Sequence, residues 1–82
     1  MKFYIQTIEQ IKGEQEGTYS EYANVSKENT EEVALSKFYK KLSDVSAALG
    51  NTHVFMDIKI VNSVGGCIKK DSVGEYVEVP VD

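Results

Sequence analysis

The side chains of this sequence that could supply a nucleophile and its base are Cys67 and His53, the one cysteine and the one histidine of the chain. A cysteine nucleophile needs a base held beside its thiol, and no spacing rule places His53 next to Cys67. A lone cysteine cannot form an internal disulfide, and these two residues are too few for a zinc site, which usually has about four ligands. We therefore expect Cys67 to be a small strand residue, and we expect no metal and no cofactor.

Acid–base chemistry would need titratable side chains held close together. His53, Asp57 and Lys59 are expected on one face of a strand, but four extended residues separate His53 from Asp57 by roughly 13 Å. The pair Gly65–Gly66 predicts a turn and not a phosphate loop, because no Lys-Ser or Lys-Thr follows it. The sequence contains no set of nucleophile, base and oxyanion donor, so we predict no catalytic residues and no enzymatic activity.

Two periodicities predict the elements that would position any site. Apolar and polar residues alternate in several segments, which predicts strands, and apolar residues recur at helical spacing over about 20 residues. Asn29 and Glu32 form a capping-box pattern at the start of that helix, and Gly50 followed by Asn51 is typical of a helix end. The predicted strands cover residues 2–12, 18–26, 52–62 and 67–79, and the last is expected to be irregular around Asp71–Gly74.

The order strand, strand, helix, strand, strand predicts an α+β fold for a single domain spanning residues 1–82. Short polar connections make each pair of strands a hairpin. We therefore expect a four-stranded antiparallel sheet (ββαββ) with one helix packed on one face and a strand order of 2-1-3-4. Ile8 and Ile11 break the alternation of the first strand, which predicts a bulge or a twist there.

One helix, about 10 Å wide, cannot cover both faces of a sheet that is roughly 15–20 Å wide. Alternation predicts that Val54, Met56, Ile58 and Ile60 face the helix. The uncovered face is expected to carry Tyr4, Ile8, Tyr22, Phe55 and Val61. Apolar residues gathered on adjacent strands mark a partner surface, so we expect a homo-oligomer. The predicted binding residues are Tyr4, Tyr22, Phe55 and Val61.

Charge excludes one class of partner. The formal net charge is −4, and the nine basic residues are all lysine. Arginine supplies the planar fork that grips phosphates and guanine edges, so an acidic chain without it is a poor candidate for binding nucleic acid. No apolar run approaches the roughly 20 residues of a membrane span, and the first ten residues do not read as a signal peptide. We expect no membrane association and a cytoplasmic protein.

Four segments carry a resemblance to a known group. They are MKFYI at 1–5, TEEVALSKFYKKL at 30–42, SAAL at 46–49 and VFMDIKI at 54–60. Together they resemble short uncharacterised proteins of phages and prophages in low-GC Gram-positive bacteria. The resemblance implies a compact ββαββ unit, often oligomeric, that acts in the cytoplasm of a host cell.

These observations lead to one main hypothesis and two alternatives. The main hypothesis is a non-enzymatic binding protein that occupies a host protein, as an antidefence inhibitor would. The first alternative is an oligomeric sponge for a small nucleotide ligand, with phosphate donors from Lys69, Lys70 and the backbone near Gly65–Gly66. The second alternative is a minor structural or assembly protein of a phage. Each rests on analogy with the class, because the residues contain no chemical motif.

Overall fold

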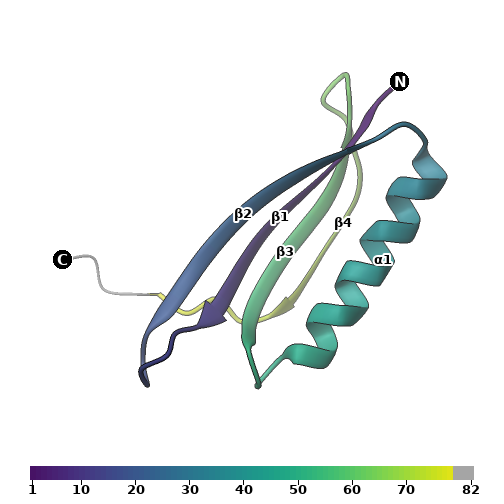
Figure 1. Ribbon diagram of the computed structural model, residues 1–82. Coiled ribbons are helices and arrows are strands. Elements are labelled where there is room, and N and C mark those ends of the chain that lie inside the picture. The colour runs from purple at the N-terminus through teal and green to yellow at the C-terminus, as the bar shows by residue number, and fades with distance from the viewer. Residues whose placement is uncertain (79–82) are drawn as a thin grey trace.

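The computed structural model describes residues 1–78, which form four strands and one helix in the order ββαββ (Figure 1). The elements are β1 (Phe3–Lys12), β2 (Tyr19–Glu28), α1 (Glu31–Ala48), β3 (His53–Asn62) and β4 (Cys67–Gly74). The strands form one antiparallel sheet of order β2-β1-β3-β4, and α1 lies on one face of it. The predicted α+β fold and strand order are confirmed. The predicted last strand is shorter than expected, since β4 ends at Gly74; Val79 and Pro80 lie outside the described residues.

The core lies between α1 and the central strands, and α1 packs mainly on β3. As the alternation predicts, Met56, Ile58 and Ile60 point towards the helix and are fully buried. From the helix, Phe38 and Val45 fill the space above them. Each such side chain contributes about 1.5–3 kcal/mol by leaving water, so this layer is the main source of stability. The remaining buried apolar residues are Ile5 and Ala34.

The helix begins one residue later than the capping pattern predicts. Thr30 is the N-cap, and its hydroxyl accepts a hydrogen bond of 3.2 Å from the N–H of Val33. The prediction that Asn29 is the N-cap is wrong, because the Asn29 side chain instead accepts a hydrogen bond of 2.6 Å from the Lys2 ammonium. The predicted end is confirmed: Gly50 follows the last turn with a φ of +81°, a conformation that glycine adopts without strain.

The pairing of β1 is irregular near the predicted place, but the extra residue lies in β3 and not in β1, and it changes the side on which one residue lies. The pairing of β1 with β3 shifts at Gln10 and Ile11, so that Phe55 lies opposite Gln10 while His53 lies opposite Ile11. Val54 is the extra residue, and the alternation of β3 therefore reverses before Phe55. The prediction that His53 shares a face with Asp57 is wrong for this reason: His53 lies on the side of the helix.

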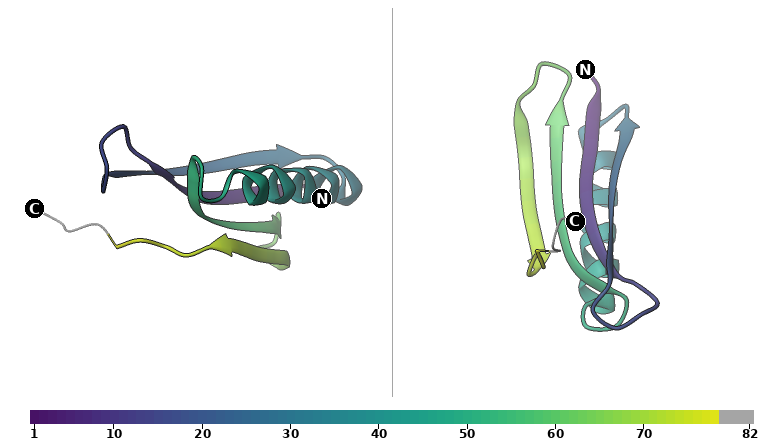
Figure 2. Two further views of the ribbon diagram at one scale, coloured as in Figure 1. Left: turned by 90° about the horizontal axis from the view of Figure 1, so that it is seen from below. Right: turned by 90° about the vertical axis from the view of Figure 1, so that its left-hand side faces the viewer.

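We call the sheet face opposite α1 the open face. The two further views show that α1 covers the other side (Figure 2), and residues 76–77, beyond β4, contact Phe55 and Gln10 on the open side. Within the part of the chain that the structure describes, no helix is long and apolar enough to cross a membrane.

The central layer makes a first prediction. Replacing Ile58 with alanine is expected to lower the free energy of unfolding by about 2–5 kcal/mol, because it leaves a cavity under α1. Lys59→Ala is the matched control, since Lys59 is the next residue of β3 and is exposed on the open face. Urea unfolding followed by circular dichroism measures both. Equal shifts of the two unfolding midpoints would contradict the assignment of the core.

Candidate binding surfaces

The pairing register decides which side chains share the open face, because residues directly opposite each other in a sheet point the same way. Tyr4 lies opposite Val61, and Gln10 lies opposite Phe55. Ile8 stands between Ala23 of β2 and Asp57 of β3. Tyr4, Phe55 and Val61 thus lie on the open face as predicted, whereas their role in binding stays a prediction.

Apolar side chains gather at the end of the open face that lies nearest the β3–β4 turn. Ile8 is 44% exposed and Val25 is 65% exposed. Val25 lies opposite Gln6, one row from Ile8 and Ala23, and Tyr4 with Val61 forms the next row. Lys27 borders this group, whereas Gln6 and Lys59 lie within it, in the same row as Val25. The arrangement mixes apolar and polar side chains, as the surface of a non-obligate protein–protein contact does.

Tyr22 does not belong to this surface, and its predicted place was wrong. It lies opposite Glu9, whose side chain points towards the helix. Tyr22 is therefore on the helix side of β2, where it is 51% exposed. The hairpin register determines this outcome, because a shift of one residue moves every side chain of a strand to the other face.

A short segment after β4, which we call the strap (residues 75–77), lies across the other end of the open face. The side-chain amide of Gln10 donates a hydrogen bond of 2.6 Å to the carbonyl of Val77 and accepts one of 2.8 Å from its N–H. Both polar groups of one side chain thus hold the backbone of the strap, as a neighbouring strand would. Gln10 is only 1% exposed as a result.

Tyr76 fixes the strap further. Its ring meets the ring of Phe55 edge to face, with 5.5 Å between the centroids. The hydrogen bond from its hydroxyl to the carboxylate of Glu21 raises the pKa of the Tyr76 phenol above its ordinary value of 10.0. The strap therefore covers Phe55, Gln10 and part of Glu21. The freely available part of the open face is the apolar end around Ile8.

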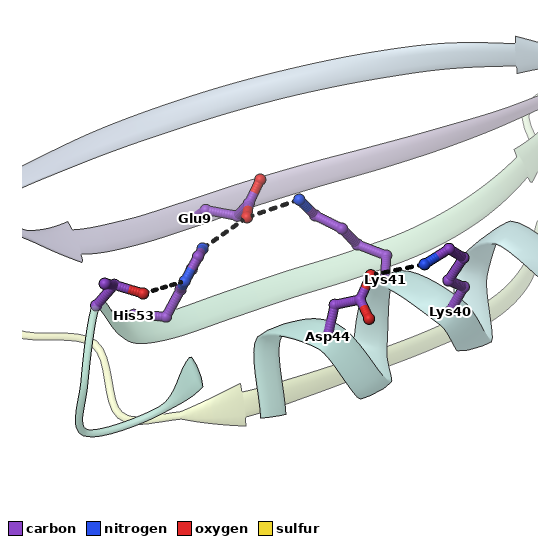
Figure 3. A network of polar contacts seen from close by, with 6 residues as sticks. Glu9, Lys40, Lys41, Asp44 and His53 are labelled. Carbon is purple, nitrogen blue, oxygen red and sulfur yellow. Dashed lines mark hydrogen bonds and ion pairs between the residues drawn. The ribbon is translucent and has the colours of Figure 1, made fainter. Parts of the chain in front are cut away.

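A buried carboxylate lies on the helix side. Oε1 of Glu9 is 3.0 Å from the Lys41 ammonium and 3.1 Å from Nε2 of His53 (Figure 3). The hydroxyl of Thr52 is 3.3 Å from Nδ1 of the same ring. A neutral imidazole protonated at Nε2 satisfies this pattern by donating to Glu9 and accepting from Thr52. The cluster compensates a buried charge, and its groups are engaged with one another.

A groove of about 430 Å³ lies between β2 and α1. This volume is within the range of small-molecule sites, and lysines line its helix side. Each lysine already has an acidic partner: Lys37 with Glu28 at 2.6 Å, Lys40 with Asp44 at 3.2 Å and Lys41 with Glu9 at 3.0 Å. An anionic ligand would have to displace these ion pairs. The other lining residues are Ile5, Thr7, Asn24, Val25 and Ser26.

The structure does not bring together the residues expected to hold a nucleotide. Lys69 lies on the helix side, where its ammonium is 5.3 Å from the centre of the Tyr39 ring. Lys70 lies on the open face opposite Lys59. The Gly65–Gly66 turn closes the β3–β4 hairpin, and the Asn62 side chain accepts a hydrogen bond of 2.8 Å from the N–H of Gly66. These donors point in different directions.

Sequence reasoning missed Glu9 and Gln10. Glu9 continues the alternation of Phe3 and Ile5, so its place on the helix side could be found from the sequence. Gln10 has no such signal, because its burial depends on the path of the strap after Gly74. Because both residues are polar, exposed side chains would be expected, whereas β1 is covered on both faces at this point.

Among residues 1–78 no group of three or more His, Cys, Asp or Glu could hold a metal ion. Cys67 is a free thiol and exposed. It lies opposite Val61 near the β3–β4 turn, far along the sheet from His53. Comparisons of the chain with protein-family models, with curated proteins and with solved structures found no match.

The Gln10 clamp makes a second prediction. Gln10→Ala is expected to lower the free energy of unfolding by about 1–2 kcal/mol and to release the strap, because two hydrogen bonds to one backbone residue are lost. Amide hydrogen exchange of Val77 should accelerate. The control is Gln6→Ala, a glutamine on the same face of β1 that lies opposite Lys59. If the exchange of Val77 does not change, the clamp does not hold the strap.

The Tyr76 phenol makes a third prediction. Its folded-state pKa is raised by Glu21, so its contribution to stability is present below the unfolded pKa and is lost as pH rises through the folded pKa. NMR titration of the Tyr76 ring should give a pKa above 10.0 that falls in Glu21→Gln. Tyr76→Phe should keep the ring contact and remove this loss of stability. A Tyr76 titration that Glu21→Gln leaves unchanged would contradict the contact.

Proposed function

We propose that this chain is a small non-enzymatic binding protein that occupies the surface of another protein through its open face. The observation that carries the proposal is the exposed apolar end of that face, where Ile8 and Val25 stand among Tyr4, Ala23 and Val61. Single exposed apolar residues are ordinary. Several of them gathered on three adjacent strands, around Gln6 and Lys59, support a partner surface.

Four sequence segments resemble phage and prophage proteins, and this resemblance supports a bacterial host protein as the partner. We propose a host protein in the cytoplasm of a bacterial cell, with inhibition of host defence as the outcome. A rigid sheet suits this role, because the strands hold the contact residues in place before the partner arrives and little order has to be gained on binding. Tyr4 is an aromatic residue of the open face that lies away from the strap, and aromatic side chains contribute strongly to such contacts.

The alternative functions have less support. A nucleotide sponge would need phosphate donors that converge, whereas Lys69 and Lys70 lie on opposite faces and the lysines of the groove are paired with carboxylates. A structural or assembly role in a phage particle has no specific observation in its favour. Native mass spectrometry of protein purified from its own host separates these alternatives, since a sponge would retain a nucleotide.

The proposal makes a fourth prediction. Affinity purification from a low-GC Gram-positive host is expected to enrich one host protein with the wild-type chain as bait, and Ile8→Ser should reduce that enrichment at least about tenfold, the loss of roughly 1.4 kcal/mol of binding. Val33→Ser is the matched control, because Val33 has a similar exposure of 43% but lies on α1.

Both variants should fold, since neither residue belongs to the core, and circular dichroism checks this. A protein that is retained equally by the wild type and Ile8→Ser does not bind the open face. Enrichment lost only in Val33→Ser would move the binding surface to the helix.

A further inference from the structure

The two outer strands of the sheet differ in how well they are protected from pairing with another strand. β4 is eight residues long, its register shifts opposite Ile60 and Val61, and it carries the charged run Lys69–Asp71. Bulges and charges of this kind discourage further pairing. β2 pairs with β1 residue for residue over ten residues without any shift. Its outer side therefore offers a regular row of backbone N–H and C=O groups.

We propose that β2 pairs with β2 of a second copy in antiparallel register centred on Asn24. Two-fold pairing about this residue places Glu21 opposite Lys27 of the other copy, and it does so twice, since the relation is symmetric. It also places Ala23 opposite Val25. All of these residues except the central Asn24 lie on the open face, where they are paired with even-numbered residues of β1, so that each opposing pair can meet.

The neighbouring registers lack this complementarity. Centring the pair on Ala23 places Glu21 opposite Val25, and centring it on Val25 places Lys27 opposite Ala23. Both leave the charges without a partner. On the helix side, the Asn24 register sets Tyr22 opposite Ser26 and Asn24 opposite itself. The exposed aromatic ring of Tyr22 is then covered in part by the second copy.

The position of α1 leaves room for this pairing. α1 packs mainly on β3, and the groove separates it from β2. Strands about 4.8 Å apart would put the two copies of β3 roughly 24 Å from each other, and each helix is about 10 Å wide. The helices would not collide, and the two sheets would join into one. The open faces would then lie side by side, which is compatible with the proposed function but does not depend on it.

The test uses the full chain with Cys67→Ser, so that no native thiol interferes. Asn24→Cys in this background should form a disulfide-linked dimer under mild oxidation, because the two copies of residue 24 face each other at about 5 Å. Tyr22→Cys is the control on the same face of β2. Its two copies would be roughly 13 Å apart, so little dimer should form. Equal cross-linking of both variants, or none of either, overturns the proposal.

Reversing the charge at position 21 or at position 27 of β2 provides a second test of the dimer. Glu21→Lys and Lys27→Glu should each weaken dimerisation about tenfold, because like charges then oppose each other. Mixing the two variants should restore the dimer, since every opposing pair of the mixed dimer again joins a lysine with a glutamate. Glu21 also accepts a hydrogen bond from Tyr76. Tyr76→Phe removes that bond without changing the charge, so it is the control for Glu21→Lys. A wild-type chain that sediments as a 9.1 kDa monomer at high concentration overturns the proposal, even if the open face binds a host protein as proposed.

Discussion

The burial of β3 beneath α1 is the interaction on which the rest of the structure depends. Met56, Ile58 and Ile60 lose all contact with water only because Phe38 and Val45 lie above them. The side chains between these residues must point to the other face of the sheet, where the strap is the described segment that covers part of the surface. The same alternation that makes the core therefore also creates the open face. A buried core on one face and a second, exposed face are two consequences of one pattern.

Polar residues of β1 are buried in this arrangement and need hydrogen-bonding partners. Glu9 and Gln10 are neighbours in the chain, point to opposite faces and are both buried. Glu9 is held by a lysine and a histidine on the helix side, whereas Gln10 is held by the strap on the open side. A buried polar group that kept no partner would cost about 1–3 kcal/mol. The helix and the strap thus each supply hydrogen-bonding partners to the strand that they cover, in addition to apolar contacts.

The fold could be predicted because it depends on local patterns, and much of the surface could not because it depends on register. Alternation predicts the strands, helical spacing predicts α1, and short loops predict the two hairpins of the sheet. Tyr22 was assigned to the wrong face because the face of β2 depends on how the hairpin pairs, which the composition of its loop does not determine. His53 was assigned to the wrong face because one bulge reverses the alternation. The pattern predicts strand for the strap as well, and the irregularity expected around Asp71–Gly74 marks the place where the chain leaves β4.

The strap also separates two ways in which the sheet can meet another molecule. It lies over Phe55 and Gln10, so two open faces could not stack along their whole length at the usual distance of about 10 Å between sheets. The edge of β2 has no such obstacle among the described residues, and the apolar end of the open face near Tyr4 and Ile8 stays accessible. Pairing along the edge would leave that apolar end free in both copies. The geometry therefore favours a division of roles, in which the edge joins the copies and the face contacts a different protein.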